Sequence, residues 1–351
     1  VLARGGRDKF EITVFGDEPY GNYNRILLSG VLAGTHDPKD IFINPLAWYD
    51  ENNLKLHANA RVSEIDRAAK VVRAANGIVE AYDKLVIATG SSAFVPPVDG
   101  LHSTDDLKSE IQNPKFKDGV FVFRTLDDCN GISSYAANAK RAVVLGGGLL
   151  GLEAARGLLN LGVETHVVHL MQHLMEVQLD QSAGGVLQQA MEQMGVTVHL
   201  EKATTAILGN GHVTGLKFKD GSELDCEMVV ISAGIRPNAQ LAKDAGLKVE
   251  RGIVVDDTLA CFGEPDIFAV GECAQHRDVV YGLVAPLWEQ TAALAERLTG
   301  RNRNATYQGS KISTKLKVMG VELAVMGDKE PAGNADEVVS YVEAKRGVYK
   351  K

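Results

Sequence analysis

The sequence predicts an α/β fold in which one structural plan occurs twice, followed by a smaller α+β piece. Three observations carry this prediction. Residues 141–168 contain a short apolar run, a glycine-rich turn, a helical stretch and a second apolar run. A segment of alternating residues followed by an apolar run and a glycine occurs in both halves of the chain. A third apolar run, residues 267–270, ends in Gly-Glu.

The strongest local pattern lies between residues 142 and 168. A β-branched run over 142–145 predicts a buried parallel strand, and Leu- and Ala-rich helical spacing follows over 149–161, before a strand over 163–168. The turn between them reads G-x-G-x-x-G, which in this context indicates a Rossmann-like dinucleotide-binding unit rather than a glycine turn without a ligand. Its glycines permit a tight turn, backbone approach to a pyrophosphate, and helix–strand packing at an exposed helix N-terminus. The predicted binding residues are Gly146, Gly147, Gly148 and Gly151.

The repeated pattern indicates that the chain holds two such units. Apolar strands within residues 83–91 and 226–238 reach Gly90 and Gly234, and each follows a turn-rich alternating segment typical of antiparallel strands. The second copy is complete. The first begins at a strand over 12–15 that ends at Asp17 and Glu18, and it lacks an opening strand and glycine turn.

Gly271 and Glu272 follow the strand predicted over 267–270. A carboxylate at a strand end can accept hydrogen bonds from sugar or ribityl hydroxyls, because ligands of open α/β sheets bind beyond the strand ends. Alone, this pattern fits a structural role equally well. Beside two nucleotide-type units it favours a flavin.

Composition narrows the class further. The net charge of −8 argues against a nucleic-acid partner, and no apolar run approaches the length of a membrane span. The four cysteines, Cys129, Cys226, Cys261 and Cys273, are too far apart for a redox dithiol, a metal site or an iron–sulfur site. This cysteine usage suits a reducing cytoplasm. We therefore expect a cytoplasmic protein without a metal site in this stretch.

Several stretches together resemble one family. "ITVFGDEPYGNYNRILLSGVLAG", "GGGLLGLEAARGLLNLGVETHVV", "LMQHLMEVQLDQSAGGVLQQAMEQMGV", "SAGIRPN", "DIFAVGECA" and "GLVAPLWEQ" are similar to the FAD- and NAD(P)-dependent oxidoreductases of the rubredoxin, ferredoxin and glutathione reductase type. Within that family, the chain most resembles the flavoprotein part of NAD(P)H-nitrite reductase large subunits. Gly271-Glu272-Cys273 matches the nitrite reductase branch. In the rest of the family, Gly-Asp is the commoner sequence at this point.

The resemblance implies a role for each matching residue. Glu18, with Asp17 beside it, would meet the adenosine ribose of FAD, and Arg25 would lie near its phosphates or flavin. Val62 would touch the adenine through its backbone. Thr89 and Gly90 would line the phosphate side of FAD, Glu272 would hold the ribityl chain, and Glu153 would lie near the flavin–nicotinamide junction. Gly234 and Gly271, each after a predicted strand, are further candidate cofactor-binding residues. No side chain is expected to act as a catalytic acid or base, because the cofactors carry the hydride transfer.

The resemblance also implies a domain division. Residues 1–117 and 242–304 would form an FAD-binding domain of glutathione-reductase type, residues 118–241 an NAD(P)H-binding domain, and residues 305–351 a truncated interface domain. Since the first glycine turn is absent, we expect a fragment that binds FAD poorly until roughly 25–30 upstream residues are restored.

The predicted function is electron input for assimilatory nitrite reduction, from NAD(P)H to FAD. Electrons would continue to downstream redox modules or a small subunit, with an iron–sulfur cluster and sirohaem outside this stretch and a homodimer as one expected assembly. Two alternatives remain. One is a stand-alone NAD(P)H reductase serving a nitrate reductase, rubredoxin or ferredoxin, and the other is a non-catalytic nucleotide-binding regulatory protein.

His169 bears on which nicotinamide nucleotide is used. An Asp or Glu normally ends the second strand and accepts hydrogen bonds from the ribose 2′-OH of NAD. His169 stands there instead, which removes repulsion against a 2′-phosphate, and a protonated imidazole can donate to that phosphate. We therefore expect dual use with a lean toward NADPH that strengthens toward pH 6. The alternative is that His169 only ends the strand and selectivity is set elsewhere.

Overall fold

The computed structural model describes residues 1–102, 116–311, 313–318, 321–327, 329, 333, 337–343 and 346–351. The chain forms two compact units, which we describe separately. Unit 1 comprises Val1–Tyr23, Phe42–Ser92 and Ile235–Ile312, and unit 2 comprises Asn24–Ile41, Ala93–Gly234 and Ser313–Lys351. The four-part domain division expected from the sequence remains a proposal. Parts of its C-terminal piece (312, 319–320, 328, 330–332, 334–336 and 344–345) lie outside the described residues.

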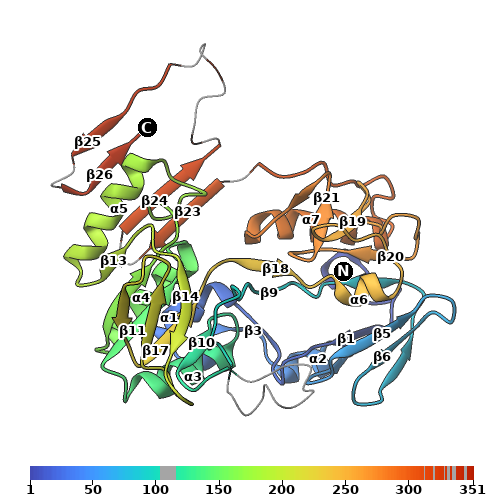
Figure 1. Ribbon diagram of the computed structural model, residues 1–351. Coiled ribbons are helices and arrows are strands. Elements are labelled where there is room, and N and C mark those ends of the chain that lie inside the picture. Colours follow the sequence, from blue (N-terminus) through green and yellow to red (C-terminus); the bar gives the residue numbers. More distant parts are fainter. Residues whose placement is uncertain are drawn as a thin grey trace. The chain divides into compact units, whose positions relative to one another are not determined.

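Unit 2 is built on a five-stranded, fully parallel sheet (Figure 1). Its strand order is β10-β17-β11-β12-β13, and β11 pairs with β12 in the register Leu145↔Val168. The strands are β10 (Val120–Val122), β11 (Arg141–Leu145), β12 (Glu164–Val168), β13 (Thr197–His199) and β17 (Met228–Ile231). Every residue of β17 is buried, as expected for a strand in a sheet covered on both faces.

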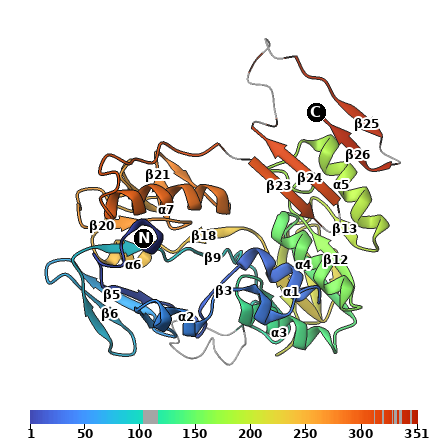
Figure 2. The same ribbon diagram turned by 180° about the vertical axis from the view of Figure 1, so that it is seen from behind.

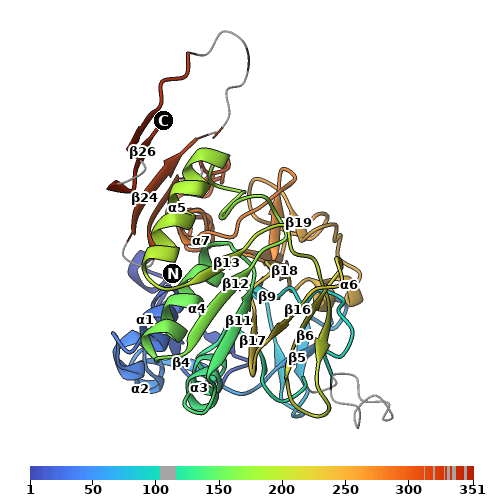
Figure 3. The same cartoon turned by 60° about the vertical axis from the view of Figure 1, so that its left-hand side comes forward.

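Three helices connect these parallel strands (Figure 3). They are α3 (Leu126–Ala136), α4 (Leu149–Asn160) and α5 (Gln181–Gln193). Helix α4 packs on β11 and β12, and α5 packs on β13. Thr125 and Asp128 form a capping box at the start of α3, and Gly162, with a φ of 83°, follows α4 in the left-handed conformation that glycine favours. The strand, turn, helix and strand predicted over 142–168 are confirmed to within one or two residues.

Antiparallel strands complete unit 2. The predicted alternating segment forms the sheet β14-β15-β16 (Figure 1). Two further antiparallel pairs, β23–β24 and β25–β26, come from the C-terminal part of the chain. The bounds are β14 (Thr204–Leu208), β15 (Gly215–Phe218), β16 (Glu223–Asp225), β23 (Ser313–Val318), β24 (Val321–Met326), β25 (Tyr341–Glu343) and β26 (Val348–Lys350).

Unit 2 also contains a segment that the sequence places in the FAD domain. This segment holds η2 (Arg25–Leu27), α1 (Leu28–Leu32) and η3 (Pro38–Ile41). Helix α1 lies against α3 and α4 (Figure 2). A Cβ on Gly157 would come within 2.5 Å of Leu32 Cγ, so glycine at this position of α4 makes room for α1.

Unit 1 contains two parallel strand pairs. β1 (Ile12–Phe15) pairs with β4 (Leu54–His57), and β8 (Leu85–Ile87) pairs with β20 (Ile267–Ala269). Among the described residues, these are the only strand partners of β1 and β8. The predicted strand over 12–15 is confirmed at both ends.

Further elements of unit 1 are short strands and helices around those pairs. The predicted alternating segment forms the antiparallel sheet β5-β6-β7, and β19, β21 and β22 form another three-stranded sheet (Figure 2). The bounds are η1 (Leu2–Arg4), β2 (Asn22–Tyr23), β3 (Phe42–Asn44), α2 (Leu46–Glu51), β5 (Val62–Asp66), β6 (Val71–Ala74), β7 (Val79–Ala81), β18 (Ile235–Pro237), α6 (Gln240–Asp244), β19 (Ile253–Val255), β21 (Ala274–His276), β22 (Val279–Val280) and α7 (Val284–Leu298). β9 (Ser91–Ala93) crosses the boundary between the units.

Each unit has a hydrophobic core of its own. In unit 1 the core gathers around β20 and β19, with Ile253 and Ala269 fully buried. In unit 2 it gathers around β11 and β17, with Val143, Val229 and Leu216 fully buried. Helices of the described part of the chain are all too short or too polar to cross a membrane.

Candidate dinucleotide-binding sites

The glycine turn of unit 2 has the backbone geometry of a phosphate-binding turn. Gly146 has a φ of 128°, and a Cβ there would lie 2.1 Å from the carbonyl oxygen of Ser232. A Cβ on Gly151 would lie 2.0 Å from the carbonyl oxygen of Gly146. Both positions therefore require glycine, the first for the turn and the third for the close approach of helix to strand.

Gly148 has a different environment. It precedes α4 in an extended conformation, with a φ of −82°, and no side chain caps the helix. No heavy atom of the described residues lies within 4 Å of the position a Cβ would take. The uncapped N-terminus of this 12-residue helix thus faces open space, where backbone N–H groups can receive phosphate oxygens. These residues fit a dinucleotide pyrophosphate.

Gly147 connects the turn to the loop after β12. Its N–H donates to His169 Nδ1 at 3.1 Å, and its carbonyl accepts from the N–H of Met175 at 2.9 Å. A Cβ on Gly147 would lie 2.7 Å from both the His169 ring and Leu174. The loop 169–176 is therefore fixed against the glycine turn.

His169 is buried and bonded through both ring nitrogens. Its Nε2 lies 2.9 Å from Oε2 of Glu176. Since an amide N–H can only donate, Nδ1 accepts and the ring proton sits on Nε2, facing Glu176. An imidazole in this state is neutral. The expected donation to a 2′-phosphate does not fit this arrangement, because the one N–H of the ring already serves a carboxylate.

Glu153 lies in the first half of α4, beneath α1. Burial raises the pKa of Glu153 to about 7, although a hydrogen bond with the Ser29 side chain acts in the opposite direction. Ser29 belongs to α1, so the segment that packs on α4 also shapes the environment of this carboxyl. A carboxyl that titrates near neutral pH beside the nucleotide turn is a candidate functional group.

Unit 1 presents a second set of predicted residues at the ends of β8 and β20. Because these strands are parallel and paired, their carboxyl ends lie side by side. Gly90 and Gly271 follow them with φ values of 66° and 89°, and neither has a described heavy atom within 4 Å of the position that a Cβ would take. Ser91 Oγ donates to Glu272 Oε2 at 2.6 Å. The cradle has room for a ligand and a carboxylate at its edge, which fits a polyhydroxyl chain.

Thr89 is held by a residue from the other half of the chain. Its Oγ1 donates to the backbone oxygen of Asn238 at 2.6 Å, and Asn238 Nδ2 donates to the Thr89 carbonyl at 2.9 Å. The N–H of Asn238 donates to the Gly90 carbonyl. Asn238 thereby orders the turn after β8. Gly234, with a φ of 108°, ends the corresponding strand in unit 2.

The acids after β1 are both bonded. Tyr23 donates its hydroxyl proton to Glu18 at 2.5 Å, and the exposed Asp17 lies 3.3 Å from Arg61 Nη1. Val62 opens β5 in the antiparallel sheet of unit 1. Arg25 belongs to unit 2, where its Nη1 donates to the carbonyl of Arg124. The structure therefore groups the predicted FAD residues in unit 1, with Arg25 as the exception.

Four contributing residues escaped the sequence reasoning: Ser91, Asn238, Glu176 and Ser29. Ser91 directly follows the turn at Gly90, and Asn238 directly follows strand β18, so a rule for polar residues next to turns and strand ends would find them. Glu176 and Ser29 act through contacts with residues 7 and 124 positions away, and no local pattern marks them.

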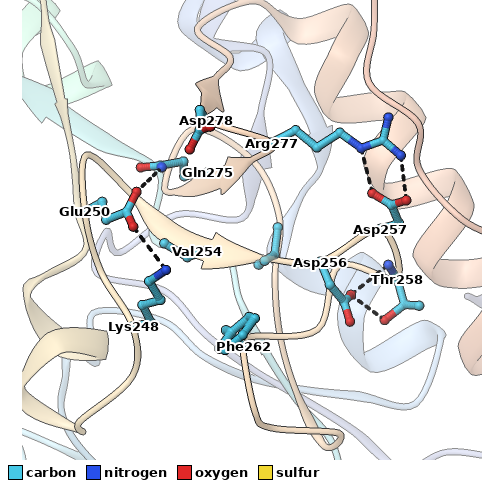
Figure 4. Close-up of a pocket in the computed structure, with 11 residues that line it drawn as sticks. Lys248, Glu250, Val254, Asp256, Asp257, Thr258, Phe262, Gln275, Arg277 and Asp278 are labelled. Carbon is cyan, nitrogen blue, oxygen red and sulfur yellow. Dashed lines mark hydrogen bonds and ion pairs between the residues drawn. The ribbon is translucent and has the colours of Figure 1, made fainter.

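A pocket on unit 1 lies among other residues (Figure 4). Glu250 bonds both Lys248, at 3.2 Å, and Gln275, at 2.7 Å, and Arg277 Nε donates to Asp257 at 2.8 Å. None of the predicted site residues lines it. Both of its cationic side chains are already paired with carboxylates. Within the described ranges, no group of three His, Cys, Asp or Glu side chains could hold a metal ion.

Comparison with known proteins defines the class. The family model of pyridine nucleotide-disulphide oxidoreductases matches residues 2–297, and the chain belongs to this family. This confirms the predicted class, an FAD-dependent NAD(P)H oxidoreductase with two Rossmann-like domains.

Individual relatives sharpen the resemblance. The chain is 45% identical over 345 residues to a nitrite reductase [NAD(P)H] of Bacillus subtilis (strain 168), covering 98% of this chain and 41% of that protein. It is 43% identical over 345 residues to the assimilatory nitrate reductase electron transfer subunit of the same organism, covering 98% and 42%. A solved ferredoxin reductase from Rhodopseudomonas palustris matches with a TM-score of 0.84 and 26% identity, over 99% of this chain and 83% of that one. The chain thus spans about two fifths of the length of these two Bacillus relatives.

Proposed function

We propose that this chain is the electron-input part of a nitrite reductase, taking hydride from NAD(P)H. The observation that carries the proposal is the 45% identity over nearly the whole chain to a protein named nitrite reductase [NAD(P)H], combined with an intact glycine turn in unit 2. When bound, FAD would supply the hydride acceptor and the means of passing electrons on singly.

The chain's own residues bind and orient the two cofactors, the nicotinamide nucleotide and FAD. In unit 2, the turn Gly146–Gly151 and the N-terminus of α4 receive the pyrophosphate of the nicotinamide nucleotide, while Glu153 lies near its reactive end. In unit 1, the residues proposed to hold FAD are Asp17, Glu18, Val62, Thr89, Gly90, Gly271 and Glu272. Arg25, which lies in unit 2, is also proposed to contact FAD, and Gly234, at the end of a unit 2 strand, is a further proposed cofactor-binding residue. No side chain is assigned a proton-transfer step.

A flavin measurement tests this proposal directly. The chain, purified with roughly 25–30 upstream residues restored, is mixed with FAD, separated from free flavin, and examined for visible flavin absorbance that NADH or NADPH bleaches without oxygen. Bleaching, and NAD(P)H-dependent reduction of an artificial electron acceptor, are the expected results. Retained flavin that neither nucleotide bleaches would instead favour the non-catalytic nucleotide-binding protein.

A second candidate rests on the 43% identity to an electron transfer subunit of assimilatory nitrate reductase. In that case the electrons would leave for a separate protein. The coding sequence beyond residue 351 distinguishes the two candidates. Ligand cysteines and a sirohaem module there support nitrite reduction, whereas a stop after the interface domain supports a separate acceptor.

The cellular setting is part of the proposal. All four cysteines are buried as free thiols, and burial raises the pKa of Cys129 to about 11 and of Cys226 and Cys261 to about 12. Inert thiols of this kind suit a cytoplasmic protein. A homodimer and docking to downstream redox modules or a small subunit are further parts of the same proposal.

A further inference from the structure

The nucleotide-binding half of unit 2 has an unusual charge pattern. From Gly157 to Glu201 the sequence contains no Lys or Arg, although it contains five carboxylates and four histidines. This stretch includes β12 and the loop that follows it, where the adenosine ribose of a bound nucleotide would lie. A site for a 2′-phosphate normally supplies an Arg, because the guanidinium binds phosphate through two parallel hydrogen bonds.

The loop after β12 brings one of those carboxylates to the glycine turn. Met175 N–H bonds the Gly147 carbonyl, and Gly147 N–H bonds His169 Nδ1. Glu176 comes next in the chain, with its Oε2 at 2.9 Å from His169 Nε2. His169 has 8% of its side chain exposed and Glu176 has 29%, so the imidazole is enclosed while the carboxylate still reaches solvent.

The hydrogen-bond directions fix the charge at this point. His169 accepts from Gly147 and donates to Glu176, so the ring is neutral and the carboxylate keeps its negative charge. One Glu176 oxygen is bonded to the ring, which leaves the other, and further lone pairs, able to accept hydrogen bonds. The edge of the sheet therefore carries a carboxylate even though position 169 does not.

We propose that Glu176 accepts the hydrogen bonds of the adenosine ribose 2′-OH and that this chain uses NADH in preference to NADPH. His169 is a positioning residue that holds Glu176 against the glycine turn. The inference rests on the proposed function, since it concerns the nucleotide of that same site. It replaces the lean toward NADPH that the lone histidine suggests.

Two described lysines contact this loop. The N–H of Lys202 donates to the His169 carbonyl at 3.0 Å, while its ammonium group is paired with Asp220. Lys329 Nζ donates to the backbone carbonyl of Glu176, and Lys351 Nζ donates to the Lys329 carbonyl at 2.8 Å. A lysine in this place could attract a 2′-phosphate. If Lys329 dominated over Glu176, NADPH would be preferred, so the two side chains make opposite predictions.

Calorimetric titration of the 351-residue chain with NADH and with NADPH at pH 8 tests the proposal without requiring turnover. The variants are Glu176→Gln and, as a matched carboxylate on an exposed face of α5, Glu192→Gln. We expect wild type and Glu192→Gln to bind NADH at least tenfold more tightly than NADPH. Glu176→Gln should weaken NADH binding by about tenfold and leave NADPH binding equal or tighter.

A second variant adds charge instead of removing it. Val177 is 73% exposed next to Glu176, so Val177→Arg should fold normally. We expect it to tighten NADPH binding by about tenfold, with little effect on NADH. Thermal melting of each variant reports whether it is folded. If Glu176→Gln does not fold, the effect of Val177→Arg on NADPH binding still tests the proposal.

The remaining outcomes distinguish a failure of this inference from a failure of the proposed function. Tighter binding of NADPH by wild type, an unchanged NADH-to-NADPH ratio in Glu176→Gln, or no response of NADPH binding to Val177→Arg would overturn this inference while leaving the proposed function intact. Failure of the folded wild-type chain to bind either nucleotide would overturn both.

Discussion

The two units of this protein build their candidate sites in different ways. In unit 2, the turn after β11 is shaped by backbone: Gly146 and Gly151 leave about 2 Å to neighbouring carbonyl oxygens where a Cβ would lie. In unit 1, side-chain hydrogen bonds organise the ends of β8 and β20. The main ones join Ser91 to Glu272 and Thr89 to Asn238. Both sites lie at the carboxyl ends of parallel strands, where α/β sheets bind ligands.

The difference follows from what each site must recognise. A pyrophosphate is bound by N–H groups and a helix N-terminus, so side chains there would obstruct the ligand. Sugar and ribityl hydroxyls need oriented acceptors, which side chains supply. Substitutions should therefore act through sterics in unit 2 and through hydrogen bonding in unit 1.

The largest expected effect comes from Gly151→Ala. Its Cβ would meet the Gly146 carbonyl oxygen at 2.0 Å, and backbone cannot move away cheaply. We expect the free energy of unfolding to fall by about 2–3 kcal/mol, measured by urea denaturation. Gly185→Ala on α5, with no described heavy atom within 4 Å, is the control and should not destabilise. Equal stability of the two variants would contradict the steric account of the turn.

The next effect is a pH dependence from Glu153. Since burial raises its pKa from 4.5 to about 7, the folded protein holds a proton that the unfolded chain releases. Its contribution to stability is complete below pH 4.5 and is lost as the pH rises to about 7. Glu153→Gln should therefore be more stable than wild type at pH 8, on the order of 2 kcal/mol. Urea denaturation at pH 5 and pH 8 measures this, and an identical pH response of the two proteins would show that Glu153 titrates normally.

A smaller effect is expected from Gly148→Ala, which should weaken nucleotide binding without changing the stability of the fold. Gly148→Ala places a methyl group in open space at the start of α4, with a φ that alanine adopts without strain. We expect unchanged melting but nucleotide binding weakened by about tenfold, because the methyl group occupies the space of the phosphates. Calorimetric titration with NADH checks the affinity. Undiminished affinity would mean that the pyrophosphate does not approach Gly148.

The smallest effect is expected in unit 1. Ser91→Ala removes the hydroxyl that donates to Glu272 and should cost about 1 kcal/mol of unfolding free energy. Ser63→Ala, which removes an exposed hydroxyl with a 3.3 Å bond, is the control with little expected change. With roughly 25–30 upstream residues restored, reduced flavin retention in Ser91→Ala but not in Ser63→Ala would further link Glu272 to the ligand. A loss equal to that of the control would show that side-chain bonding does not organise this strand end.

Local signals in the sequence determined the elements and one of the sites. The strand over 12–15 and the run from 142 to 168 were predictable because hydrophobic periodicity and glycine spacing act within a few residues. The phosphate turn was predictable for the same reason, since its chemistry lies in the backbone of consecutive residues. Gly146, Gly148 and Gly151 needed no distant partner to be recognised.

Tertiary structure alone decided the partners of the side chains. His169 looked like a lone cation opposite a phosphate, but the amide of Gly147 and the carboxylate of Glu176 make it a neutral bridge. Helix α1 packs on α4 at Gly157, although the sequence assigns it to the FAD domain, and its Ser29 hydrogen-bonds the Glu153 carboxyl, whose pKa is raised by burial. Charge state and burial depend on groups brought together from distant positions, and the local spacing of residues does not encode those contacts.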